Sequence, residues 1–304
     1  MNFIFPYPSQ RMPVMARNVV ASSQPLAVQA GISMLQQGGN AVDAALATAI
    51  ALTVVEPTSN GIGSDGYAIV WDGTQLHGLN ASGRAPAAWT PEYFDQKHRG
   101  VATIPERGWD SVTVPGAVSQ WVALSEKFGR LPFEALFVPA IHYARDGFHV
   151  SPITAESWTR QAGMLRGQPD FVRDFMKDGR APHAGEKWTF AAQAATLEDI
   201  AATRGESFYR GALAAKIAAH AAASGGAMTE ADLANHRADW VGTLHTGYRD
   251  VRLHEIPPNG QGLAALIALG ILRQFDLAGH PVDSADSVHL QLEAMKLAFA
   301  DVFR

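Results

Sequence analysis

The residues best suited to ligand chemistry lie in the segment 80–86, which reads Asn-Ala-Ser-Gly-Arg-Ala-Pro. Glycine and proline around Arg84 indicate a rigid loop. A guanidinium group held in such a loop can bind a carboxylate through two parallel hydrogen bonds. The competing interpretation is a surface arginine in a structural ion pair, and spacing alone favours that second interpretation.

A second motif, the segment 61–66, reads Gly-Ile-Gly-Ser-Asp-Gly and fits the pattern G-x-G-x-x-G. That pattern binds dinucleotides only where a strand precedes it and a helix follows, because the pyrophosphate lies at the helix N-terminus. Here a helical segment precedes it and a strand-like segment follows, so we exclude nucleotide binding. The glycines then mark either close packing of chain on chain or close approach to a ligand, and both interpretations stay open.

Other familiar catalytic and metal-binding patterns are missing from the sequence. Its 304 residues include no cysteine, which excludes thiolate nucleophiles, disulfides and cysteine-bound metals. The 11 histidines lack a metal-binding spacing, and His280 and His289 are the pair nearest to one. No G-x-S-x-G or phosphate-binding G-x-x-x-x-G-K-[ST] motif occurs. We therefore expect neither a metal nor a cofactor.

Composition and charge describe an ordinary globular protein, with 47% hydrophobic and 17% charged residues. A net charge of -5 without a basic stripe argues against a nucleic-acid partner. The most apolar window, Ala44 to Val55, is shorter than the roughly 20 residues that a membrane span needs. The start of the chain has a short apolar stretch and no basic residue before it, unlike a secretory signal, so we expect a cytoplasmic protein without a membrane partner.

Periodicity, turn residues and caps predict a mainly helical chain with two strand regions. Residues 41–55 are apolar on every face, so this helix should lie in the core. Asp72-Gly73 between two apolar-rich runs predicts a hairpin, and Tyr248 to Ile256 reads as a second strand region. Helices are predicted at 25–37, 41–55, 115–128, 132–146, 153–165, 193–204, 210–224, 262–274 and 284–304. The sequence shows no repeat and no linker, which favours a single domain over residues 1–304.

The last predicted helix has no glycine, asparagine or proline stop before Arg304. Domains rarely end in an uncapped apolar helix. We therefore expect that the natural polypeptide continues or that a second chain completes the fold.

A series of short motifs runs through nearly the whole chain in a fixed order. They occupy residues 38–45, 55–57, 61–63, 85–87, 114–116, 139–140, 147–148, 208–211, 232–233, 248–249, 257–258 and 293–301. In this order the chain resembles the gamma-glutamyltranspeptidases. The resemblance implies an α+β fold, the αββα four-layer sandwich of the N-terminal-nucleophile hydrolases, incomplete in this chain and completed by a C-terminal fragment.

Members of that family are made as precursors that cut themselves before a threonine. The new terminal threonine is the nucleophile and its own amine is the base. This chain resembles the large-subunit portion, and Met1-Asn2 offers no Ser, Thr or Cys. The resemblance therefore implies that no catalytic residue lies in this chain and that a small-subunit fragment supplies the threonine. It also implies a γ-glutamyl amide such as glutathione as donor, with transfer to water or an amine.

The loop around Arg84 departs from the family pattern Asp-Gly-Arg-Glu-x-Ala-Pro, whose arginine binds the α-carboxylate of the donor. Aligned on Ala85-Pro86, Ser82 occupies the position of that arginine, and Arg84 follows two residues later. We predict that Arg84, supported by Ser82, binds the donor carboxylate. A cephalosporin or glutaryl acylase of the same superfamily, and a non-catalytic scaffold, are the alternatives.

Overall fold

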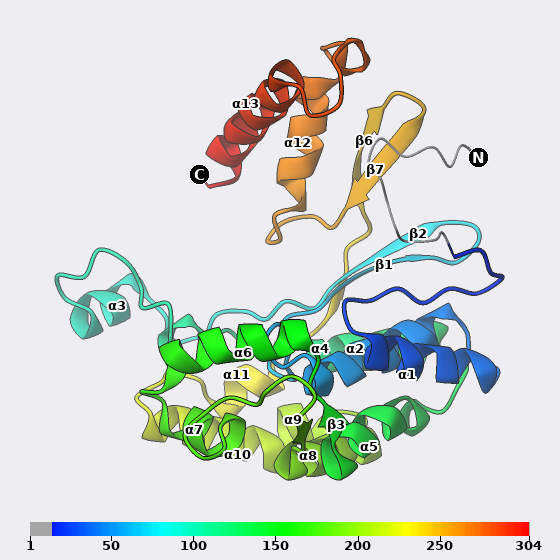
Figure 1. Cartoon of the computed structure of the whole chain (residues 1–304). Helices are drawn as coiled ribbons and strands as arrows, with labels where there is room; N and C mark the ends of the chain where they lie inside the picture. Colours follow the sequence, from blue (N-terminus) through cyan, green and yellow to red (C-terminus); the bar gives the residue numbers. More distant parts are fainter. Residues whose placement is uncertain (1–13, 304) are drawn as a thin grey trace. The chain divides into compact units, whose positions relative to one another are not determined.

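The computed structural model describes residues 14–303, which divide into two compact units (Figure 1). Unit one contains residues 14–17, 67–80 and 239–303, and unit two contains residues 18–66 and 81–238. Residues 1–13 and Arg304 lie outside the described residues. The predictions about the compartment and about the absent N-terminal nucleophile rest on residues 1–13. The single domain over 1–304 stays a prediction.

Unit two is built mainly from helices (Figure 1). The α-helices are α1 (Pro25–Gln36), α2 (Ala41–Val55), α3 (Pro91–Lys97), α4 (Ala117–Phe128), α5 (Val138–Asp146), α6 (Pro152–Leu165), α7 (Pro169–Phe175), α8 (Ala191–Thr203), α9 (Glu206–Arg210), α10 (Ala212–Ala223) and α11 (Glu230–Ala234). Two short 3-10 helices, η1 (Trp109–Ser111) and η2 (Phe133–Phe137), join them. The strands β3 (Phe148–His149) and β4 (Lys187–Trp188) pair antiparallel.

Helix α2 lies in the core of unit two, as its apolar character predicts. It packs against α1, α4, α5 and η2, and most of its side chains are buried. Its close contact with α1 depends on Gly31, because a methyl group there would lie 2.3 Å from Oγ1 of Thr48. The predicted cap is also confirmed, since the side chain of Asn40 accepts the amides of Val42 and Asp43.

A buried carboxylate fixes the start of α2. Asp43 is 0% exposed and accepts the amide of Asn40 at 2.8 Å. It also accepts the amide of Arg130 at 3.1 and 3.2 Å and that of Leu131 at 3.3 Å. A charge this deep is tolerated only when donors surround it. Asp43 therefore ties α2 to the turn that follows α4.

Unit one combines strands with a helix pair (Figure 1). Strands β1 (Tyr67–Trp71), β2 (Leu76–Asn80) and β5 (Asp239–Trp240) form one antiparallel sheet, and β6 (Leu244–Tyr248) pairs with β7 (Val251–Glu255). The hairpin predicted at Asp72-Gly73 is confirmed: Asp72 closes it by accepting the amides of Thr74 and Gln75. Helices α12 (Gly262–Leu272) and α13 (Ala285–Val302) pack side by side. The segment that connects them contains the short 3-10 helix η3 (Leu277–Gly279).

Some elements differ from the predictions. The single helix predicted over 132–146 is a 3-10 turn followed by α5, because Pro139 lacks the amide that a continuous α-helix would need. The strand region predicted over 248–256 is confirmed as β7, but its partner β6 was not predicted, and the turn between the two strands places Arg249 at φ 54. Helices α3, α7, α9 and α11 were not predicted, since five to seven residues show too little periodicity.

Helices and strands thus combine in the α+β class expected from the sequence. Among residues 14–303, no helix has both the length and the apolar character needed to cross a bilayer.

Removing the Asp43 carboxylate should destabilise the protein strongly. Asp43→Ala leaves buried backbone amides without an acceptor, so we expect a loss of about 3–5 kcal/mol in the free energy of unfolding. Denaturant titration measures the change. Asp95→Ala, which truncates an exposed carboxylate on α3, is the control and should change stability by about 0.5 kcal/mol or less. Equal stability of the two variants would contradict the assigned role.

Candidate functional site

The glycine-rich segment 61–66 forms a tight turn after α2, so a helix precedes it and a strand follows, as predicted. The amide of Gly61 donates to Oγ of Ser64 at 3.0 Å. A methyl group on Gly66 would lie 2.4 Å from a side chain of α4, whereas one on Gly63 would meet nothing within 4 Å. Close packing of chain on chain therefore explains Gly66 and leaves Gly63 unexplained.

The carbonyl oxygen of Ser64 connects this turn to the start of α4. It accepts the amide of Gly116 at 3.0 Å and the amide of Ala117 at 2.8 Å. The first amides of a helix have no partner within the helix, and Gly116 offers no side chain to cap them. The glycine-rich turn therefore acts as the cap of α4.

The segment 81–86 passes so close to the start of α4 that only glycine fits at two positions. A methyl group on Gly83 would lie 1.5 Å from the carbonyl oxygen of Val114. A methyl group on Gly116 would lie 1.4 Å from the carbonyl oxygen of Ala81. Both distances are far below van der Waals contact, so any side chain would push the two segments apart.

Ser82 and Arg84 lie on this closely held backbone. The amide of Val114 donates to the carbonyl oxygen of Arg84 at 3.0 Å, and the amide of Gly83 points to Oδ1 of Asp65 at 3.5 Å. The side chain of Arg84 is exposed and that of Ser82 is half-buried. The structure therefore brings both predicted residues into one fixed loop beside the glycine-rich turn.

A carboxylate from α11 holds the other end of this loop. Oδ1 of Asp232 accepts the amide of Ala87 at 2.8 Å, next to the buried Pro86. Oδ2 accepts the amide and the hydroxyl of Thr229 at 2.9 and 2.6 Å. Burial alone would raise the pKa of Asp232, but these hydrogen bonds outweigh it and lower the pKa below its usual value. The sequence analysis missed this role, although the spacing Thr-x-x-Asp is a capping signal.

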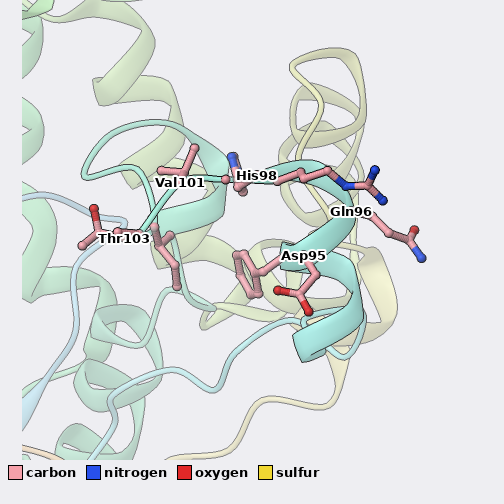
Figure 2. Close-up of a pocket in the computed structure, with 10 residues that line it drawn as sticks. Asp95, Gln96, His98, Val101 and Thr103 are labelled. Atoms are coloured by element: carbon pink, nitrogen blue, oxygen red, sulfur yellow. The ribbon is translucent and has the colours of Figure 1, made fainter.

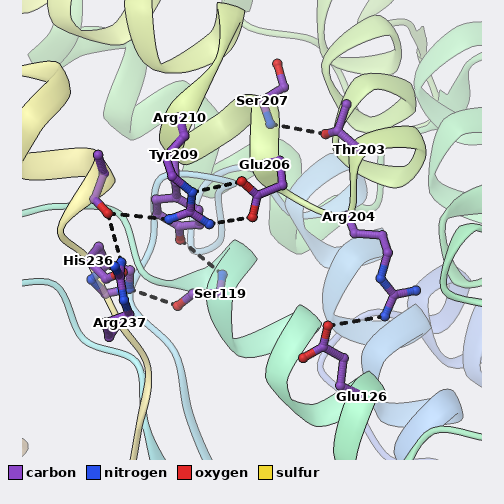
Figure 3. A network of polar contacts seen from close by, with 11 residues as sticks. Ser119, Glu126, Thr203, Arg204, Glu206, Ser207, Tyr209, Arg210, His236 and Arg237 are labelled. Carbon is purple, nitrogen blue, oxygen red and sulfur yellow. Dashed lines mark hydrogen bonds and ion pairs between the residues drawn. The ribbon is translucent and has the colours of Figure 1, made fainter.

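A second polar cluster also holds the start of α4 (Figure 3). The Tyr209 hydroxyl donates to the carbonyl oxygen of Pro115 at 2.8 Å and accepts the amide of Ser119 at 3.0 Å. Because Oγ of Ser119 donates to the carbonyl oxygen of Gly116, it accepts a hydrogen bond from Nε2 of His236 at 2.8 Å. Burial raises the pKa of Tyr209 to about 12, against hydrogen bonding from Ser119, so the phenol stays a donor.

Helix α3 is fastened by the largely buried Asp110. Its carboxylate accepts Tyr93 at 2.8 Å, Lys97 at 2.9 Å and Nε2 of His98 at 2.7 Å. Burial alone would raise the pKa of Asp110, but these donors, led by Lys97, lower it. Beside the cluster, residues 94–96 and 98–104 line a depression of about 490 Å³ (Figure 2). The sequence analysis missed this cluster because its members are ordinary surface residue types.

The histidine pair noted in the sequence does not form a site. Nδ1 of His280 lies 4.0 Å from a carboxylate oxygen of Asp286, while His289 is exposed on α13. Within residues 14–303, no three histidine, aspartate or glutamate side chains are placed to hold a metal ion.

Comparisons of this chain with family models and with curated proteins agree on one family. A family model described as gamma-glutamyltranspeptidase matches residues 27–303. A glutathione hydrolase-like proenzyme (YwrD) of Bacillus subtilis is 34% identical over 288 residues, which cover 94% of this chain and 54% of that protein. An oxamate amidohydrolase proenzyme of Klebsiella pneumoniae is 37% identical over 284 residues, which cover 90% of this chain and 52% of that protein.

Solved structures agree with this assignment. The crystal structure of a cephalosporin acylase from Bacillus halodurans matches with a TM-score of 0.91 and 49% identity, over 99% of this chain and 57% of that chain. The α+β fold of the N-terminal-nucleophile hydrolase type is thereby confirmed. This chain spans about half the length of the curated relatives that it matches.

Removing the Asp232 carboxylate should loosen the loop that carries Arg84. For Asp232→Ala we expect the Ala87 amide to exchange its hydrogen at least about 10-fold faster, because a lost hydrogen bond to a charged acceptor costs about 1.5–3 kcal/mol. Hydrogen exchange over residues 85–88 measures this. The pKa of Asp232 is lowered, so the protection should be complete above the usual pKa of an aspartate and decline as the pH falls through the lowered value.

The control for this experiment is Glu230→Ala, which removes an exposed acidic residue from the same first turn of α11. It should leave exchange at residues 85–88 unchanged. If Asp232→Ala and Glu230→Ala protect these amides equally, the carboxylate does not hold the loop.

Proposed function

Because this chain belongs to the gamma-glutamyltranspeptidase family, we propose that it is the large-subunit portion of a self-processing amide hydrolase. Two facts support the proposal. The matched relatives are proenzymes, and this chain covers about half of their length. The remaining half would supply a C-terminal fragment that completes the αββα sandwich.

The proposed nucleophile is the N-terminal threonine of that fragment. Its hydroxyl attacks the carbonyl carbon of the amide, and the proton passes through its own amine to the departing amine. The acyl group is then held as an ester until water or an amine acceptor takes it. In this proposal the present chain supplies substrate-binding residues and no catalytic residue.

The residues proposed to bind the donor are Arg84 and Ser82. The observation that carries this assignment is the clamped backbone of their loop, which is fixed at Gly83, at the carbonyl of Arg84 and at Ala87. A rigid base allows an exposed guanidinium to meet a carboxylate with little loss of conformational freedom. We propose that Arg84 takes the place of the family's arginine, which aligns with Ser82.

Arg84→Ala in the full-length protein should weaken donor binding. We expect the KM for a γ-glutamyl anilide to rise by roughly 10–100-fold with kcat little changed, since the lost charge-assisted hydrogen bonds contribute about 1.5–3 kcal/mol. Steady-state kinetics measures both constants. Arg99→Ala, which removes an exposed arginine from a different loop, should behave like the unmodified protein. An unchanged KM for Arg84→Ala would exclude Arg84 from the donor site.

The proposed partner fragment has apolar surface to cover on unit one. Leu292 is 58% exposed, Leu297 57% and Phe303 74%, all on α13 or at its end. Val251 on the hairpin β6–β7 is 59% exposed. Exposed large apolar side chains on neighbouring turns of one helix, such as those of α13, are a feature of interfaces. They support the proposal that further chain packs here.

Self-processing can be tested on a denaturing gel. We expect the reading frame to continue past Arg304 to a threonine followed by a strand, and the expressed full-length product to run as two fragments. Replacing that threonine by alanine should give a single uncut band, which is the matched control. A single band from the unmodified product would instead favour a non-catalytic scaffold.

A second candidate function is an acylase of the cephalosporin or glutaryl type. It is favoured by the 49% identity to a cephalosporin acylase and by serine at the aligned arginine position. Side-by-side assays with γ-glutamyl and glutaryl anilides separate the two functions. The glutaryl group lacks only the α-amino group of the γ-glutamyl donor and keeps the carboxylate at the same end. A preference for glutaryl anilide would therefore identify an acylase, and the carboxylate proposed to contact Arg84 would be present in both substrates.

A further inference from the structure

A depression of about 410 Å³ lies within unit two, between α4, α9 and the residues that follow α11 (Figure 3). Its size is within the range of small-molecule sites. Three arginines and two glutamates line it, and these are Arg204, Arg210, Arg237, Glu126 and Glu206. Counted as formal charges, they leave one surplus positive charge.

Two of the three arginines are neutralised by carboxylates. Arg210 forms a forked pair with Glu206, with Nε 2.8 Å from Oε2 and Nη2 bonded to Oε1. Nη2 of Arg204 lies 3.6 Å from Oε1 of Glu126. The carboxylate of Glu206 is close enough to Arg237 for the charge of that arginine to help lower the pKa of Glu206, after the larger effect of Arg210, but the two form no ion pair.

Arg237 is oriented by the backbone instead of by a carboxylate. Its Nη1 donates to the carbonyl oxygen of Ala234 at 2.8 Å and to that of His236 at 2.6 Å. Within residues 14–303, no carboxylate lies in ion-pair distance of Arg237. Nη1 of Arg210 also points to the Ala234 carbonyl, at 3.4 Å, so two guanidinium groups share one oxygen. Carbonyl groups fix the Arg237 fork without cancelling its charge, and Nε and Nη2 are left to donate elsewhere.

The other large depressions do not share this imbalance. Beside Gly61, the lining residue Arg173 is paired with both Asp170 and Asp174. In the depression lined by residues 94–96 and 98–104, the formal charges of Asp95 and Arg99 cancel. We therefore propose that the depression at Arg237 binds a small molecule through an oxyanion, a carboxylate or a phosphate, that bridges Nε and Nη2 of Arg237. This inference does not depend on the proposed amide hydrolysis.

Calorimetric titration of the full-length protein with inorganic phosphate, and separately with acetate, tests the proposal. Sodium chloride should hold the ionic strength constant, because exposed charge pairs are screened by salt. We expect saturable binding of one anion, weakened at least about 10-fold in Arg237→Gln. Binding of phosphate alone would identify a phosphate site, and binding of both anions would identify a general oxyanion site.

The matched control is Arg107→Gln, because Arg107 is also exposed. Within residues 14–303, its one hydrogen-bond partner is the sulfur of Met164. It should bind the anion like the unmodified protein. Arg237→Lys keeps the positive charge but loses the forked pair of donors, so we expect its affinity for the anion to fall several-fold. If circular dichroism shows that Arg237→Gln does not fold, the affinity of Arg237→Lys tests the proposal instead. Absence of saturable binding, or equal binding by the Arg237 variants and the control, would overturn the proposal.

Discussion

The close approach of two backbone segments at Gly83 and Gly116 is the constraint on which the candidate site depends. Carbonyl oxygens occupy the space that a Cβ would need at both positions. This contact brings the Arg84 carbonyl within hydrogen-bond distance of Val114. A larger residue at either glycine would separate the loop from α4, and the remaining contacts of the loop would have to move with it.

Helix α4 can provide a fixed reference because both of its ends are held by the flanks of α2. The carbonyl of Ser64, which follows α2, accepts the first amides of α4. At the other end, Nδ2 of Asn40, the cap of α2, donates to the carbonyl oxygen of Phe128 at 2.6 Å. Most side chains of α2 are buried, so α2 has a fixed position in the core of unit two. The hydrogen bonds from its flanks fix α4, and α4 in turn fixes the surface loop.

The sequence was sufficient for the elements with a clear periodic or turn signal. The buried helix over 41–55, the hairpin at Asp72-Gly73 and the helix pair near the end of the chain were predicted with bounds close to those observed. The short helices α9 and α11 were missed, although they carry Tyr209 and Asp232. Too few residues lie in each to show a period, and their stability comes from contacts with distant segments.

The site itself was only partly predictable. Ser82 and Arg84 were predicted from the loop composition and from the family motif, and their role in binding stays a prediction. The partners that hold their loop were not predicted, because no local pattern shows that Asp65, Val114 and Asp232 meet segment 83–87 in the fold. Asp110 is a similar case, since only the fold reveals that Tyr93, Lys97 and His98 meet at one carboxylate.

The separation of 145 residues between Ala87 and Asp232 has a consequence for biosynthesis. At the usual rate of roughly 5–20 residues per second, the ribosome makes the aspartate on the order of 10 s after the loop has emerged. During that interval the loop lacks the acceptor for its amide. The hydrogen bond to Ala87 therefore forms only after the partners of the glycine-lined contact, which are nearer in the chain, have become available.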